Sequence, residues 1–193
     1  MRLYQYVDYL RETLGDDFVN MAGYVKNLRA AIKAAHAMNV EIQVIEGSCC
    51  FVHNDNGNVM QIGNKISFEK LVSAFCHEMW HLEHFRFQYT LDEVMTISPD
   101  LYLANMLMME FDAYKRERLT LVQIKRSGYP ITDRFCLALL KANNNRKLAE
   151  QIHMTYVGQR GYINYCKRGL EAGRERVKLA LSQGQDLSNM RFQ

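Results

Sequence analysis

One short region of this 193-residue chain carries the pattern of β-strands, and that restriction limits the fold more than any other feature. Residues 40–46 alternate apolar and polar side chains, as a strand with one buried face does. The apolar segments 50–53 and 59–62 flank a polar run that contains Asn56-Gly57. Both of these residues accept positive φ, which is typical of a hairpin turn. We therefore expect a small antiparallel sheet of about three strands.

The rest of the sequence has apolar side chains at helical spacing. Together with capping residues, this spacing predicts helices over about 2–14, 16–36, 68–88, 98–126, 132–142, 146–156 and 163–182. The predicted fold class is α+β, mainly helical, with the small sheet followed by packed helices. The length predicts a single domain over residues 1–183 and a flexible tail over 184–193.

The composition is that of an ordinary globular protein, with 48% hydrophobic and 23% charged residues. No apolar run in the sequence approaches the roughly 18 residues that span a bilayer, so no membrane partner is expected. The first residues do not resemble a secretory signal, and the five cysteines form no C-x-x-C pair. These features favour reduced thiols and a cytoplasmic location, while export by a route that needs no signal stays open.

Positive charge is concentrated at the C-terminal end of the chain. Residues 141–193 hold 10 Lys and Arg against 4 Asp and Glu, whereas the net charge of the whole chain is only +3. A basic run of this kind is usually a solvated helix face, although it can contact nucleic acid. The basic residues in question lack a recognisable binding motif and are interrupted by Glu171 and Glu175; they are Arg160, Lys167, Arg168, Arg174, Arg176 and Lys178.

The predicted helix 68–88 contains the sequence His77-Glu78-Met79-Trp80-His81, which is an H-E-x-x-H motif. Histidines four residues apart lie on one helix face, one turn apart, and can bind a single metal ion. Zinc suits two imidazole ligands. Glu78 interrupts an apolar stripe of the helix, and because a buried unpaired carboxylate costs several kcal/mol, a metal or another partner must offset its charge.

A catalytic zinc site needs a third protein ligand and one open position. His84 lies two turns from His77, about 10 Å along the axis, so the three histidines cannot easily share one ion. Position 87, where a third histidine would fall in a metzincin, is Phe87. Glu110, on the next long helix, shares a face with Ala113, whereas Asp112 lies about 200° round the helix from Glu110.

The H-E-x-x-H motif followed about thirty residues later by Glu110-Phe111-Asp112-Ala113 resembles the compact gluzincin-type zinc metallopeptidases, and most closely the small metallopeptidase-like domains of bacteria and phages. The resemblance covers about residues 38–118. It implies that His77, His81 and Glu110 bind Zn²⁺ and that Glu78 is the general base. It also implies a hydrolase that cleaves peptide bonds in a protein or peptide substrate, with the motif helix as a zincin-type active-site helix.

Two positions depart from this family pattern. Glu83 stands where zincins usually have an apolar residue, and Tyr114 stands where larger gluzincins have an aspartate that orients a histidine. The residue that orients the ligand histidines is therefore open. The oxyanion formed during hydrolysis also needs a stabilising group.

Four residues of the C-terminal helices are candidates for that stabilising group: His153, Tyr156, Tyr162 and Tyr165. We favour His153 and Tyr156 as the catalytic residues of this kind. An extended peptide could add to the edge of the strand at 58–62. The alternative functions are a zincin-like module that binds metal without catalysis and a helical protein that binds nucleic acid.

Overall fold

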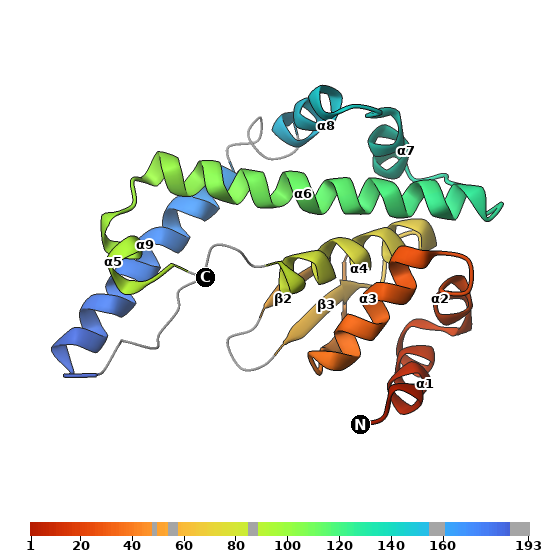
Figure 1. Ribbon diagram of the computed structural model, residues 1–193, viewed down its shortest axis with the longest axis horizontal. Helices are drawn as coiled ribbons and strands as arrows, with labels where there is room; N and C mark the ends of the chain where they lie inside the picture. Colours follow the sequence, from red (N-terminus) through yellow and green to blue (C-terminus); the bar gives the residue numbers. More distant parts are fainter. Residues whose placement is uncertain (48–49, 54–57, 85–88, 155–160, 186–193) are drawn as a thin grey trace. The chain divides into compact units, whose positions relative to one another are not determined.

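A computed structural model describes residues 1–47, 50–53, 58–84, 89–154 and 161–185 (Figure 1). Within these residues the helices are α1 (Leu3–Leu14), α2 (Asp16–Met21), α3 (Lys26–Ala37), α4 (Phe68–Glu83), α5 (Leu91–Thr96), α6 (Pro99–Arg126), α7 (Arg134–Lys141), α8 (Asn145–Ile152) and α9 (Gly161–Ser182). The strands are β1 (Glu41–Ile45), β2 (Cys50–His53) and β3 (Val59–Gly63). The prediction of a mainly helical α+β fold is confirmed.

The sheet is mixed, so the prediction of a purely antiparallel sheet is wrong in one respect. Strands β2 and β3 pair antiparallel, as the Asn-Gly turn signal indicates, but β1 pairs with β3 in parallel. The strand order is β1-β3-β2. The chain reverses direction between β1 and β2 and again between β2 and β3, so β3 returns to the direction of β1. Because β3 then lies beside β1, that pair is parallel.

The central place of β3 also corrects the expectation that residues 58–62 offer a strand edge. Both sides of β3 are paired within the sheet, so β3 cannot accept an added peptide strand. The outer edge of β1 is engaged by α1: the Tyr9 hydroxyl donates to the Ile42 carbonyl at 3.0 Å and accepts from the Ile42 amide at 2.7 Å. Strand β2 forms the other edge of the sheet.

Helix boundaries differ from the predictions mainly in two places. The helix predicted over 16–36 is divided into α2 and α3, and the Arg29 side chain donates to the carbonyls of Ala22 and Gly23 in the turn between them. Helix α5 lies between the helices predicted over 68–88 and 98–126, where no helix was predicted, and begins with a capping box formed by Thr90 and Glu93. Residues 85–88, 155–156 and 186–193, to which some predicted elements extend, lie outside the described residues.

The chain divides into two compact units, each described separately below. The first comprises residues 1–84 and 112–148, and the second comprises 85–111 and 149–193. Two of the three boundaries run through the continuous helices α6 and α8. This division leaves the single domain over 1–183 a prediction, because two compact units can belong to one domain.

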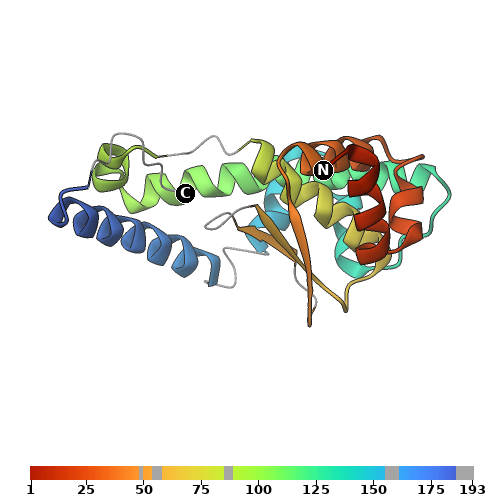
Figure 2. The ribbon, with the colours of Figure 1, turned by 90° about the horizontal axis from the view of Figure 1, so that it is seen from below.

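In the first unit, α4 packs against α3 and against β2 (Figures 1 and 2). Ser67 caps α4 by accepting a hydrogen bond from the Lys70 amide at 3.3 Å. In the first turn of α4, the buried Glu69 accepts hydrogen bonds from the amides of Thr132 and Asp133, both at 2.8 Å. Although burial acts to raise the pKa of Glu69, these hydrogen bonds lower it below its ordinary value. The start of α4 is thus fixed to the segment that precedes α7.

The second unit has its own core, to which α5, α6 and α9 contribute. Its buried side chains are Tyr89, Val94, Tyr102, Cys166, Leu170 and Val177. The Arg174 guanidinium on α9 donates to the carbonyls of Val94 and Ile97 at the end of α5. These bonds satisfy carbonyls that the short helix leaves without partners of its own.

Two predictions from composition can be compared with these residues. No helix in the described part of the chain is long and apolar enough to cross a membrane. Three cysteines, Cys76, Cys136 and Cys166, are buried free thiols. Cys49 lies outside the described residues.

Candidate metal centre

Three side chains that can bind a metal converge where α4 and α6 face each other. His77, His81 and Glu110 each offer one donor atom, and these three atoms all lie within 4.8 Å of one another. His77 is 5% exposed, whereas His81 and Glu110 are half-buried. The sequence predicted this juxtaposition of a histidine pair with a carboxylate from the next long helix.

The spacing of the two histidines fits a shared ion. The Nε2 atoms of His77 and His81 lie 3.1 Å apart, and their rings meet nearly edge to face, with an interplanar angle of 68°. Two nitrogen ligands each about 2.0–2.1 Å from a tetrahedral zinc lie roughly 3.3 Å apart. The helix thus holds both nitrogens at nearly the separation that zinc requires.

A second carboxylate on α6 sets the tautomer of His77. His77 Nδ1 lies 3.0 Å from Oε2 of Glu117, and Glu117 is only 3% exposed. The other oxygen of Glu117 accepts a hydrogen bond from the Ser73 hydroxyl at 3.1 Å. An ionised carboxylate only accepts hydrogen bonds, so His77 carries its proton on Nδ1 and directs the lone pair of Nε2 toward His81.

Glu117 is therefore placed to orient the His77 ring, and the sequence left open which residue does so. It lies seven residues after Glu110 on the same face of α6, rather than four residues after it. Tyr114, which stands where the larger gluzincins have an aspartate, is buried, and its ring meets the His77 ring edge to face, with 4.6 Å between ring centroids. The tyrosine at position 114 thus places an aromatic ring against the His77 imidazole.

The two competing ligand candidates have other partners. His84 stacks on Trp80, with 4.8 Å between ring centroids and 7° between the planes, and its Nδ1 lies 3.2 Å from the Trp80 carbonyl oxygen. Asp112 forms an ion pair with Lys115 at 3.4 Å. Neither residue belongs to the group of converging donors found among the described residues, in agreement with the sequence-based expectation.

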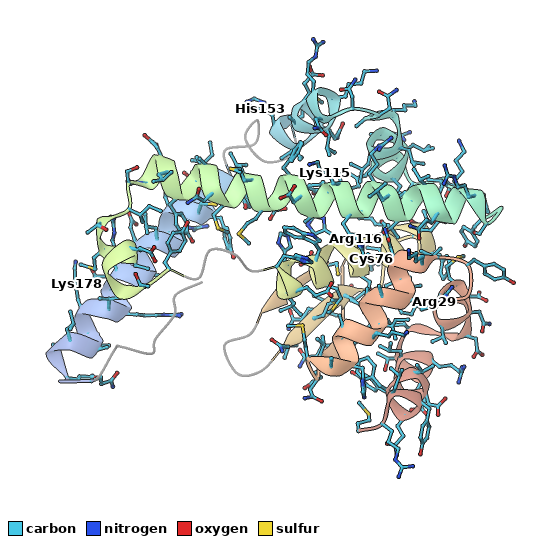
Figure 3. All side chains as sticks on the ribbon, in the orientation of Figure 1. Arg29, Cys76, Lys115, Arg116, His153 and Lys178 are labelled. Atoms are coloured by element: carbon cyan, nitrogen blue, oxygen red, sulfur yellow. The ribbon has the colours of Figure 1, made fainter. Side chains whose placement is uncertain are left out.

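The remaining predicted residues are placed as follows. Glu78 follows His77 on α4, is half-buried and is not one of the three converging donors. His153 is exposed just past the end of α8, as Figure 3 shows, and is not a member of the donor group either. Tyr156 lies outside the described residues. The catalytic roles assigned to these three residues stay predictions.

Sequence reasoning missed the contacts of two residues near the site. Glu117 could have been found, because an acid on the same helix face as Glu110 and Ala113 must point toward the motif helix. Tyr162, which the sequence offered only as an oxyanion candidate, donates its hydroxyl hydrogen to Oε1 of Glu110 at 3.3 Å. No local pattern indicates that contact, because the two residues are 52 positions apart.

Comparisons with protein-family models, curated proteins and solved structures found no match to this chain. The resemblance to gluzincins therefore rests on the motif residues, and the metal site rests on the geometry described above.

Proposed function

We propose that this protein is a zinc-dependent metallopeptidase that hydrolyses peptide bonds in a protein or peptide substrate. The observation that carries the proposal is the convergence of the two motif histidines with Glu110, within 4.8 Å of one another. Two imidazoles and one carboxylate form a donor set used by catalytic zinc, with a fourth position left for water or substrate. Glu117 supports the same interpretation, because ligand histidines commonly donate their other ring N–H to a carboxylate.

Glu78 is the proposed general base. When bound, zinc would polarise a water molecule and the scissile carbonyl. The Glu78 carboxylate then accepts the proton of the attacking water and returns it to the leaving amine. Glu78 directly follows His77 on α4. This supports its role, because one helix then positions both proposed histidine ligands and the proposed base. His153 and Tyr156 remain the proposed oxyanion stabilisers.

The sheet supports a peptide as the substrate class. Strand β2 is an edge strand that packs against the motif helix α4, and among the described residues its one strand neighbour is β3. An extended peptide could pair with the outer edge of β2 through main-chain hydrogen bonds. This location replaces the predicted docking edge at residues 58–62.

The cytoplasm is the proposed place of action. The free thiols of Cys76, Cys136 and Cys166 are buried, and unpaired cysteines persist in a reducing compartment. Burial raises the pKa of the Cys76 thiol to about 12, so this residue next to the motif stays protonated at neutral pH.

The decisive experiment compares Glu78→Gln with Glu83→Gln, a matched carboxylate-to-amide change at an exposed position of the same helix. Zinc content of the purified chains and the new N-termini that each produces in a cell extract are measured. Wild type and Glu83→Gln should hold about one zinc per chain and yield the same cleavages. Glu78→Gln should keep the zinc and lose the cleavages, because an amide cannot accept the proton.

Three outcomes would contradict the proposal. Wild-type protein without zinc would exclude the metal centre. Undiminished cleavage by Glu78→Gln would exclude Glu78 as the base. Zinc without cleavage of any substrate by wild type would favour the metal-binding module without catalysis.

Two of the basic residues that could serve the nucleic-acid alternative have partners within the protein. Arg174 is engaged with the carbonyls at the end of α5, and Lys178 pairs with Glu175 at 2.7 Å. Binding that weakens steeply with salt would revive this alternative.

A further inference from the structure

We propose that Tyr162 is a positioning residue that holds the Glu110 carboxylate in place for the metal. This inference rests on the proposed metal centre and adds to it a residue from the C-terminal helix α9. In this inference Tyr162 contacts Glu110, a proposed metal ligand, whereas an oxyanion stabiliser would contact the substrate.

The contact itself is specific. The Tyr162 hydroxyl donates to Oε1 of Glu110 at 3.3 Å, and the Tyr162 side chain is half-buried. A phenol hydroxyl can donate a hydrogen bond and a carboxylate oxygen accepts one, so the contact is a hydrogen bond from Tyr162 to Glu110.

Tyr162 is suited to positioning because its own place is fixed. Its ring packs against the core of the second unit, to which α9 contributes the buried side chains of Cys166, Leu170 and Val177. A phenol on a packed helix has few conformations, whereas a glutamate side chain has three rotatable bonds. The hydrogen bond thus limits the orientations of the Glu110 carboxylate before a metal binds.

The neighbouring tyrosine provides a control within the same helix. Tyr165 stacks on Tyr162 with 6.2 Å between ring centroids, but it is 63% exposed. Replacing either tyrosine by phenylalanine removes one hydroxyl and keeps the ring. A difference between the two variants therefore reports the hydroxyl of Tyr162 and not the loss of a phenol from α9.

The test measures the zinc affinity of the full chain by competition with a chromogenic chelator. Outer-shell partners of metal ligands typically contribute about 10- to 100-fold in metal affinity. Tyr162→Phe should weaken zinc binding by that factor, whereas Tyr165→Phe should stay within about 3-fold of wild type. The visible absorption of the cobalt-substituted protein should change in Tyr162→Phe alone, because the ligand carboxylate is reoriented.

A double-mutant cycle separates positioning from a general effect on folding. In a Glu110→Gln background, Tyr162→Phe should cause little further loss of zinc affinity, because its target carboxylate is already gone. Equal zinc affinities for Tyr162→Phe and Tyr165→Phe, or full additivity with Glu110→Gln, would overturn the inference and leave the metal centre standing. Absence of zinc from the wild-type chain would overturn both.

Discussion

Two carboxylates on one face of α6, Glu110 and Glu117, have very different surroundings. Glu117 is almost completely buried and accepts hydrogen bonds from Ser73 and His77, both on α4. Glu110 is half-buried, accepts from Tyr162 and is one of the three converging donors. In the proposed metal centre, the same residue type, seven positions apart, would thus orient a metal ligand in one case and act as a metal ligand in the other.

Glu117 and Glu110 differ in burial, and this difference separates their proposed roles. A carboxylate enclosed by protein donors is satisfied without a metal, so its removal takes an acceptor away from buried donors. A half-buried carboxylate beside two imidazole nitrogens is placed where an ion can reach it. Loss of Glu117 should therefore lower both the free energy of unfolding and the zinc affinity, whereas loss of Glu110 should lower mainly the zinc affinity.

The largest effect is expected for Glu110→Ala. With one of three proposed ligands removed, zinc affinity should fall by more than about 100-fold, beyond the range found for outer-shell partners. The free energy of unfolding of the metal-free protein, measured in urea, should change little. Chelator competition and urea titration together test the first half of the comparison. Unchanged zinc affinity would show that Glu110 is not a ligand.

Glu117→Ala should produce the next largest effect on zinc and the largest effect on stability. The buried His77 Nδ1 hydrogen would lose its carboxylate acceptor, which costs about 1–3 kcal/mol of unfolding free energy, whereas the Ser73 hydroxyl can still donate to the Lys70 carbonyl at 3.3 Å. Zinc affinity should fall by about 10- to 100-fold, because His77 is no longer held in one tautomer and orientation. Glu117→Gln keeps the side-chain shape and an acceptor oxygen, so it should be the milder variant in urea titration. A metal-free stability equal to that of wild type for Glu117→Ala would contradict the buried role.

These two carboxylates also show which parts of the site can be predicted from the sequence alone. The spacing of His77 and His81 is a property of one helix, and the pairing with Glu110 follows from the face of the next long helix, so both were predictable. Glu117 was recognisable as a residue of that face, but its bond to His77 depends on the depth at which α6 packs on α4. That depth is a tertiary property that no local pattern records.

The sheet and α9 show the same limit at larger scale. The Asn-Gly turn predicted the antiparallel β2–β3 pair, because a hairpin is local. The position of β3 between β1 and β2 depends on tertiary contacts that a local sequence pattern does not record. Because β3 has that position, β1 pairs with β3 in parallel. The contact of Tyr162 with Glu110 likewise joins residues 52 positions apart, and the pattern around either residue does not indicate the other.

Ser73→Ala should have a smaller effect on the Glu117 side of the comparison. Ser73 is completely buried, and its hydroxyl lies 3.1 Å from Oε1 of Glu117. Loss of one such hydrogen bond costs about 0.5–1.5 kcal/mol of unfolding free energy. Since His77 keeps its own bond to Glu117, zinc affinity should fall by less than about 10-fold, below the effect of removing the orienting carboxylate itself. A zinc defect as large as that of Glu117→Ala would mean that Ser73 fixes the carboxylate more strongly than His77 does.

The smallest effect is expected for Asp112→Asn, which sharpens the assignment of Glu110. Both Asp112 and Glu110 are acids of the family-like segment on α6, two residues apart, but Asp112 pairs with Lys115 at a surface where the two side chains are 40% and 42% exposed. Exposed ion pairs contribute about 0–1 kcal/mol, so urea titration should show little change. Zinc affinity should stay at the wild-type value, because Asp112 lies outside the group of converging donors.

Glu110→Gln, the same carboxylate-to-amide change, is the matched comparison and should lose most of the affinity. If instead Asp112→Asn loses zinc and Glu110→Gln keeps it, the face of α6 that meets the histidines has been assigned incorrectly.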